Sequence, residues 1–309
     1  MTDTSKTKTQ DELEQHPIDL TVANLSENAL YQYSSELLEI LLRDRTTSFY
    51  TKKKKNIIWA NDNYVDHGEK YGKNCQITPD LITGEKGNLI VPRALKSKER
   101  QKERTKSKAE VFTPSWVVKK QNDELDNNYQ EDDLSTYTAR TWLEITCGEA
   151  PYIANRYEMQ TGEIIALHER VGFLDRKLKR INQEINHKQK WQKLIKIAYQ
   201  SSYGFEWNGD SLLLARENLL LTYRDYYFDQ WQCEPSLDEL IQIATIISYN
   251  IFQMDGLTGA MPLFQRAEIA DSYQADLFAE IKIKSITTHG HMVKVKDWKT
   301  KQLVDFMEK

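Results

Sequence analysis

Trp142-Leu143-Glu144-Ile145-Thr146-Cys147-Gly148-Glu149-Ala150-Pro151-Tyr152-Ile153 is the stretch around which the chain is organised. It begins as a short apolar segment of the β type, stops at Cys147-Gly148 and continues into a segment that is compatible with a helix. A strand that ends at a glycine and turns into a helix directs backbone N–H groups into the crevice at the carboxyl end of a sheet, where open α/β sheets bind nucleotide-like ligands. An ordinary turn between a strand and a helix has the same appearance, so this stretch alone does not decide the function.

Length and composition bound the possible classes of protein. A chain of 309 residues can bury one large core, or one domain with a smaller appendage. No apolar run approaches the roughly 20 residues that cross a bilayer, and the first residues lack the apolar segment of a signal peptide. Three scattered cysteines, Cys75, Cys147 and Cys233, form no zinc-binding pattern. We therefore expect a globular protein in the reducing cytoplasm, without a membrane partner.

Charge is distributed unevenly along the chain. The net charge is -4, which is not typical of a nucleic-acid-binding protein. However, Lys52–Lys55 forms one basic run, and residues 93–108 form a second, opposed only by Glu99 and Glu103. Such runs can neutralise phosphates, although most are solvated faces or linkers.

The pattern predicts three parts. Residues 1–25 are expected to be a flexible N-terminus. Residues 26–92 are expected to form a helical and hairpin module: one helix from an N-cap at Ser26, a short strand at 56–60, and then a turn-rich region. Residues 93–309 form the main domain, with insertions at 155–200 and 260–292.

Within the main domain, helices and strands alternate. A helix is predicted to begin at Thr113-Pro114, with Thr113 as the cap and Pro114 in the first helical position. Apolar residues at three-and-four spacing between residues 171 and 198 predict one long amphipathic helix, or two in series, facing the core. A strand over 201–207, which ends in a carboxylate, is followed by a helix over 211–221.

The C-terminal third continues this alternation. Ser236 and Glu239 predict a capping box. The apolar residues from Ile246 onward predict a third strand that ends before Asp255-Gly256, although Asp-Gly is also common in hairpins. Residues 260–292 are expected to hold a short helix and a strand, and 293–298 one more strand. His289 and His291 are expected to be surface residues in a turn, because no further metal ligand lies nearby.

Glu144–Ala150 resembles the first S-adenosylmethionine-binding motif of the N6-adenine DNA methyltransferases, which commonly reads acid-Pro-x-Cys-Gly-Thr-Gly. Glu144, Cys147 and Gly148 match. Ile145 replaces the proline, Glu149 the threonine and Ala150 the second glycine. The methyl group of Ala150 is expected to restrict approach of the backbone to a ligand.

Three further segments resemble motifs of the same family, in the same order along the chain. Phe112-Thr113-Pro114 is similar to the motif that packs round the methionine end of the cofactor. Tyr203–Glu206 and the following helix are similar to the second motif, in which a carboxylate holds the ribose hydroxyls. Asp255-Gly256 is similar to the third, in which an Asp accepts a hydrogen bond from the adenine amino group. The resemblance covers roughly residues 93–300.

The resemblance implies an α/β fold of the Rossmann-like class I S-adenosylmethionine-dependent methyltransferase type, with an incomplete sheet and a small N-terminal appendage. It implies S-adenosylmethionine as the cofactor and no metal. The cofactor-binding residues that it implies are Phe112, Thr113, Pro114, Glu144, Thr146, Cys147, Gly148, Ala150, Glu206, Trp207, Asp255 and Gly256.

One motif of the family is missing. In these methyltransferases, the tetrapeptide Asn/Asp-Pro-Pro-Tyr/Phe at the end of the fourth strand holds the adenine that is flipped out of the DNA stack. The present sequence contains no such tetrapeptide. In the family, this motif follows a segment like the one that closes this chain. The resemblance therefore implies the cofactor-binding component of a restriction-modification "subunit M" methyltransferase (with the gamma-type order of motifs), whose catalytic loop and DNA recognition come from a partner chain. A catalytically inactive interaction or regulatory protein, and a fragment of a longer enzyme, are the alternatives.

Overall fold

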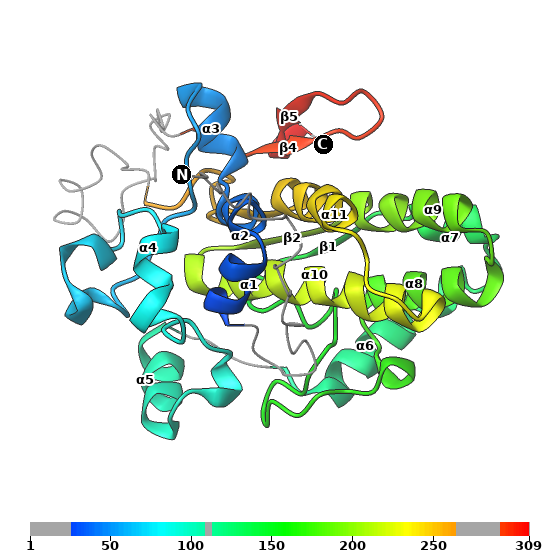
Figure 1. Ribbon diagram of the computed structural model, residues 1–309, viewed down its shortest axis with the longest axis horizontal. Helices are drawn as coiled ribbons and strands as arrows, with labels where there is room; N and C mark the ends of the chain where they lie inside the picture. The colour runs from blue at the N-terminus through cyan, green and yellow to red at the C-terminus, as the bar shows by residue number, and fades with distance from the viewer. Residues whose placement is uncertain (1–25, 109–112, 264–290, 309) are drawn as a thin grey trace, which may run out of the picture.

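A three-stranded parallel sheet lies at the centre of the computed structural model, which describes residues 26–108, 113–263 and 291–308 (Figure 1). The strands are β1 (Trp142–Glu144), β2 (Ser202–Glu206) and β3 (Ile251–Gln253), in the order β1-β2-β3. Glu144 pairs with Gly204, and Glu206 pairs with Gln253. Because the strands are parallel, their carboxyl ends meet at one edge. The α/β class is therefore confirmed.

Helices connect the strands in pairs. α8 (Phe173–Glu184) and α9 (Lys188–Gln200) lie between β1 and β2, so the residues after 171 form two helices in series. The segment 155–200, which was predicted as an insertion, lies in the connection between these two strands. α10 (Gly209–Trp231) and α11 (Leu237–Asn250) lie between β2 and β3. The capping box at the start of α11 is confirmed, since Ser236 and Glu239 bond each other's backbone N–H. The third strand begins at Ile251, later than the prediction, because residues 246–250 continue α11.

The two faces of the sheet are covered by different cores. On one face lies the main core, which includes most of the first four turns of α10. On the other face, Tyr203, Phe205 and Phe252 pack with Val293 and Val295. Parallel sheets are usually covered on both faces, as the alternation of side chains along β2 allows.

β4 (Lys294–Lys296) and β5 (Leu303–Asp305) form a separate antiparallel pair. The strand predicted within 293–298 is therefore confirmed as β4, although it pairs with β5 and not with the central sheet. Val293 N–H donates to Gly259 O, and Phe306 packs against the rings of Phe205 and Phe252, so this pair lies on the face of the sheet and not at its edge. The helix and strand predicted within 264–290 lie outside the described residues, as do 1–25.

The N-terminal module, residues 26–92, contains α1 (Glu27–Tyr33), α2 (Ser35–Leu42), α3 (Arg45–Thr51) and α4 (Pro79–Ile82). α5 (Lys98–Lys108) follows it in the basic 93–108 segment. The single helix predicted from Ser26 was wrong. Ser34 has an extended backbone and its Oγ accepts from Leu37 N–H, which starts α2 as a new helix. Ser26 is the N-cap residue of α1, but its side chain makes no capping bond and donates instead to Gly87 O.

The strand predicted at 56–60 is replaced by two isolated bridges, Arg43 with Asn56 and Ile58 with Gln76. The Gln76 side-chain oxygen accepts a hydrogen bond from Asn56 N–H, which in a sheet would donate to a neighbouring strand. The expected hairpin is instead a series of single helical turns, in addition to α4: Val65–His67, Glu69–Tyr71 and Gly84–Lys86. Further single turns lie at Arg93–Leu95, Asn127–Tyr129, Leu167–Glu169 and Phe306–Glu308.

α6 (Ser115–Asp126) and α7 (Leu134–Ala139) precede β1. Pro114 is the N-cap residue of α6, with an extended backbone, so the prediction of Pro114 in the first helical position was one residue early. Thr113 does not cap this helix.

Candidate cofactor-binding site

The carboxylate of Glu206 ends β2 and is buried. Its Oε2 accepts from Gly148 N–H at 2.9 Å, and its Oε1 accepts from the backbone and side-chain N–H groups of Asn208, both at 3.0 Å. Burial raises the pKa of Glu206, and the bonds from Asn208 and Gly148 oppose that rise. The structure therefore joins the end of β2 to the loop that follows β1.

That loop has an unusual backbone. Thr146, Gly148 and Ala150 all have positive φ angles, of 47°, 55° and 61°. A Cβ atom at Gly148 would meet no other atom within 4 Å, so open space lies beside this residue. Ala150 is fully buried in the main core. Its methyl group is therefore packed within the protein, and the expectation that it restricts the approach of a ligand stays a prediction.

Glu144 lies at the end of β1 with its carboxylate turned toward its own loop. The carboxylate accepts from Tyr152 N–H at 3.3 Å and from Ile153 N–H at 3.0 Å. Burial, with a smaller contribution from the nearby Glu206, raises its pKa to about 8 against the two hydrogen bonds, which lower it. Glu144 therefore holds the loop in place, and it lies close to Glu206.

Cys147 and Thr146 differ in their surroundings. Cys147 N–H donates to Phe205 O at 2.8 Å, and its buried thiol lies against Gly204. Burial raises the pKa of this thiol well above its ordinary value. The thiol therefore contributes to packing and is not a reactive nucleophile. The Thr146 side chain is exposed.

The start of α6 lies beside the same loop. Ser115 N–H donates to the Glu158 carboxylate at 3.2 Å, and Asn155 Nδ2 donates to Ser115 Oγ at 3.3 Å. Asn122, further along α6, donates to Tyr152 O at 3.1 Å. The structure thus brings Thr113 and Pro114 to the segment after β1. Phe112 lies outside the described residues.

Asp255 and Gly256 follow β3, on the opposite side of β2 from Glu144. Met254 N–H donates to Glu206 O, and Asp255 Oδ1 accepts from Leu257 N–H at 2.9 Å in a tight turn. A Cβ atom at Gly256 would come within 2.8 Å of the Phe205 ring, which explains the glycine. The Leu257 side chain is 97% exposed on this turn.

The N-terminal module closes the site from a side that the sequence did not predict. Trp207 Nε1 donates to Ala60 O at 2.8 Å, so this ring is anchored to the module. The Gln253 side chain bonds both backbone groups of Ile58, and it also donates to Trp207 O. Asn208 and Gln253 were missed because amide side chains carry no pattern in a sequence.

A second acid, Asp210, was also missed. It is fully buried at the start of α10, where it accepts from Asn61 Nδ2 at 3.1 Å, from Tyr64 OH at 2.9 Å and from Arg104 at 2.5 Å. Lys96 Nζ lies 3.8 Å away. Although burial alone would raise the pKa of Asp210, Arg104 and Lys96 hold it well below its usual range. This network fixes the basic 93–108 segment against the main domain.

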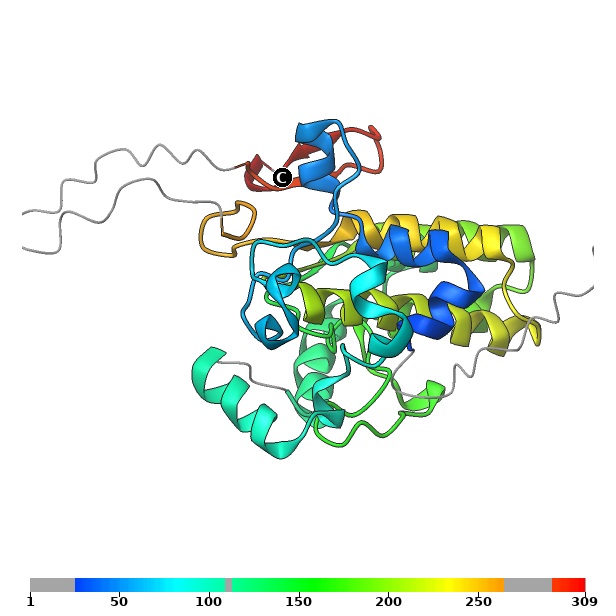
Figure 2. The same cartoon turned by 60° about the vertical axis from the view of Figure 1, so that its left-hand side comes forward.

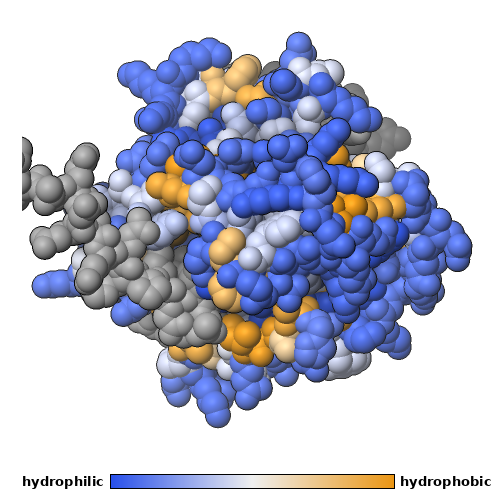
Figure 3. Space-filling view, turned by 45° about the vertical axis from the view of Figure 1, so that its right-hand side comes forward, coloured by the Kyte–Doolittle hydropathy of each residue, from blue (hydrophilic) through white to orange (hydrophobic). Residues whose placement is uncertain are grey.

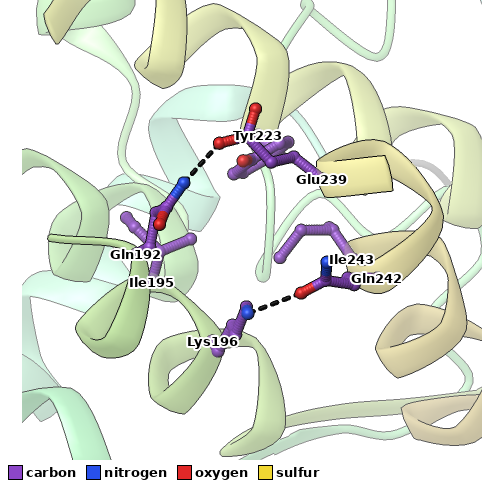
Figure 4. A pocket seen from close by; sticks show the side chains of 7 residues that line it. All are labelled: Gln192, Ile195, Lys196, Tyr223, Glu239, Gln242 and Ile243. Atoms are coloured by element: carbon purple, nitrogen blue, oxygen red, sulfur yellow. Dashed lines mark hydrogen bonds between the residues drawn. The ribbon is translucent and has the colours of Figure 1, made fainter. Parts of the chain in front are cut away.

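Two cavities in the described part of the chain lie elsewhere. The one in Figure 4 is a space of about 100 Å³ between α9, α10 and α11, crossed by a Lys196–Gln242 hydrogen bond of 2.5 Å. It is smaller than ordinary ligand sites. The other, of about 410 Å³, lies beside the second half of α10, where Asp225 pairs with Arg156 and Arg170.

Comparisons of the chain with protein-family models, with curated proteins and with solved structures find no match. Among the described residues, no helix has both the length and the apolar character that crossing a membrane requires. Within the same residues, no three His, Cys, Asp or Glu side chains gather in a way that could hold a metal ion.

Proposed function

We propose that the chain is the S-adenosylmethionine-binding component of a DNA N6-adenine methyltransferase of a restriction-modification system, with a Rossmann-like methyltransferase fold. The observation that carries this proposal is the convergence of Glu206 and the Gly148 backbone at the carboxyl edge of a parallel sheet. A carboxylate at the end of the second strand and an open glycine loop after the first are what a nucleoside ligand requires.

The residues fit such a cofactor. Glu206 has two oxygens that accept from Gly148 and Asn208, and the two ribose hydroxyls could take the place of these donors. The open space at Gly148 gives the cofactor body access to the loop. Asp255 would accept from the adenine amino group, and Thr113-Pro114, with Phe112, would face the methionine end. Bound there, S-adenosylmethionine would supply an electrophilic methyl group.

The exposed side of β1 supports a partner chain. Among the described strands β1 pairs only with β2, and its Leu143 is 43% exposed although its register partner Tyr203 is buried. Ile145, just beyond β1, is 67% exposed. Unpaired strand edges and apolar patches of this kind favour association. A chain that carries the Asn-Pro-Pro-Tyr loop could continue the sheet there and position the target adenine.

The missing catalytic tetrapeptide favours a second candidate, a regulatory or interaction protein that has kept the fold without the chemistry. Methyl-transfer assays on DNA separate the two functions. Activity that appears only when this chain is mixed with the neighbouring restriction-modification polypeptides supports the first. Association with those polypeptides without activity in any mixture supports the second.

Calorimetric titration with S-adenosylmethionine and S-adenosylhomocysteine tests the cofactor site. The wild-type chain is expected to bind both. The Glu206→Ala variant is expected to bind at least about tenfold more weakly, because a hydrogen bond to a charged group contributes about 1.5–3 kcal/mol. Glu184→Ala, an exposed glutamate of α8, is the matched control and is expected to bind like the wild type. Absence of binding at millimolar ligand would refute the proposal.

A further inference from the structure

Two segments far apart in the sequence form a lobe on top of the molecule in both ribbon views (Figures 1 and 2). We call residues 43–55, with α3, and 291–305, with β4 and β5, the basic lobe. Thr46 Oγ1 accepts from Lys294 N–H at 3.1 Å, and Tyr50 OH donates to Met292 O at 3.3 Å. The Tyr50 and His291 rings stack at 4.0 Å. These contacts hold the two segments as one surface.

The basic lobe concentrates positive charge in a chain whose net charge is -4. It contains ten Lys and Arg residues against three Asp residues. The cations are Arg43, Arg45, Lys52, Lys53, Lys54, Lys55, Lys294, Lys296, Lys299 and Lys301. The uneven charge along the sequence therefore becomes a strongly positive patch in three dimensions.

Each of the three acids already has a structural role. Asp44 is buried and caps α3 through the N–H groups of Thr46 and Thr47. Asp297 accepts from Lys299 N–H at 2.8 Å in the turn between β4 and β5. Asp305 pairs with Lys294 at 2.7 Å. The ten cations outnumber these three acids, so the patch is strongly positive.

Like charges are packed together here. The Arg45 guanidinium and the Lys296 ammonium both lie 4.4 Å from the centre of the Tyr249 ring. Burial lowers the pKa of Lys296, and repulsion from Arg45 and Lys301 lowers it further. A polyanion that bound at this patch would relieve that repulsion.

The surface also offers aromatic side chains between the cations. Phe49 is 38% exposed, with Lys52 Nζ 4.2 Å from its ring centre, and Lys296 lies 4.6 Å from the Trp298 ring. Lys53, Lys54, Lys299 and Lys301 are exposed around them. Lysines on two separate turns suit the spaced phosphates of a nucleic acid, to which aromatic rings and cations both bind. The face in Figure 3 is mostly hydrophilic, with small separate apolar areas.

We infer that the basic lobe binds the phosphate backbone of duplex DNA. The positive surface stands on its own observations, whereas the choice of duplex DNA rests on the proposed function. Val293 N–H donates to Gly259 O, so the lobe adjoins the loop that begins at Asp255. DNA held on the lobe would therefore pass beside the carboxyl edge of the sheet.

Fluorescence anisotropy with a labelled DNA duplex at several salt concentrations tests this inference with the full-length chain. Lys53→Glu/Lys54→Glu and, separately, Lys299→Glu are expected to weaken binding by about tenfold or more and to reduce its salt dependence. Lys190→Glu/Lys193→Glu, two exposed lysines of α9, is the control and should bind like the wild type.

Three results would overturn the inference: no binding of the wild type at low salt, equal weakening by the α9 control, or binding to anionic phospholipid vesicles but not to DNA. Calorimetry with S-adenosylhomocysteine on the same variants keeps the two proposals apart. Unchanged cofactor binding with lost DNA binding supports the lobe. If the wild type binds DNA but no cofactor, the proposed function is refuted, whereas the inference that the basic lobe binds DNA is retained.

Discussion

The Glu206 carboxylate accepts a 2.9 Å hydrogen bond from Gly148 N–H, across 58 residues of sequence. This bond joins the carboxyl end of β2 to the loop after β1, two segments that the sequence pattern singles out separately. Because Glu206 is buried, its oxygens need partners in every state of the protein. Ribose hydroxyls could supply those partners in a complex.

The contribution of Glu206 to binding is expected to depend on those hydroxyls. Glu206→Ala should weaken S-adenosylhomocysteine binding by at least about tenfold. The same substitution should have little effect on a 2′,3′-dideoxy analogue, which lacks the diol. Calorimetry on the wild type and the variant, each with both ligands, measures how far the loss of affinity at Glu206 depends on the ribose hydroxyls. If the variant loses equal affinity for both ligands, Glu206 does not contact the ribose.

Ala150→Gly is expected to be neutral or stabilising by up to about 1 kcal/mol. A left-handed backbone costs an L-residue roughly 1–2 kcal/mol, which offsets the extra chain entropy of glycine. Ala198→Gly in α9 also removes a buried methyl group but has no such strain to relieve, so it should destabilise by about 1 kcal/mol or more. Urea unfolding compares them. Equal destabilisation by both substitutions would contradict the strain argument.

Asp210 is expected to be a principal stabilising group of the N-terminal module. Asp210→Asn should cost about 3–5 kcal/mol at neutral pH, because it leaves Arg104 and Lys96 without their buried partner. The pKa of Asp210 is lowered on folding, so its contribution is present above the ordinary value of 3.8 and is lost as the pH falls below it. The difference in unfolding free energy between wild type and variant should therefore stay constant above the ordinary value of 3.8 and begin to shrink only below it. Equal unfolding free energies of wild type and variant at pH 7 would rule this role out.

Glu27 and Glu217 form a buried pair of acids between α1 and α10. Burial raises the pKa of Glu27 to about 8, and burial and the charge of Glu27 raise that of Glu217. The folded state thus binds protons more tightly than the unfolded state, so stability should fall as the pH rises from about 4.5 to about 8. Glu27→Gln should raise the unfolding free energy at pH 8 by about 1–3 kcal/mol.

Glu36→Gln on α2 removes an exposed glutamate and serves as the control for this pair. It should leave the pH dependence of unfolding unchanged. A pH profile of Glu27→Gln that matches the wild type would show that the pair is not the source of the effect.

Local patterns predicted those parts of the fold that depend on neighbours in sequence. The strand ending at Glu206, the helix after it and the Ser236 capping box each follow from side chains within a few residues. The candidate site was predicted from the resemblance to a series of family motifs, together with the polar residues at strand ends. Parallel pairing then brings Glu144, Glu206 and Asp255 to one edge.

The errors involve long-range partners. Residues 56–60 form isolated bridges and bond the side chains of Gln76 and Gln253, without joining a neighbouring strand. β4 has the same alternating pattern whether it joins the central sheet or pairs with β5. The positions of Lys96 and Arg104 depend on their contacts with Asp210. Asp210 lies 106 residues beyond Arg104 in the sequence. Such contacts leave no periodic signal, so a single sequence does not predict them.

Hydrogen exchange with and without S-adenosylhomocysteine tests the central claim most directly, because it locates bound ligand on the backbone. The proposed site predicts slower exchange of peptides covering residues 144–152 and 204–209, and no change in α9. Protection confined to other segments, or none at saturating ligand, would contradict a cofactor site at the carboxyl edge of this sheet.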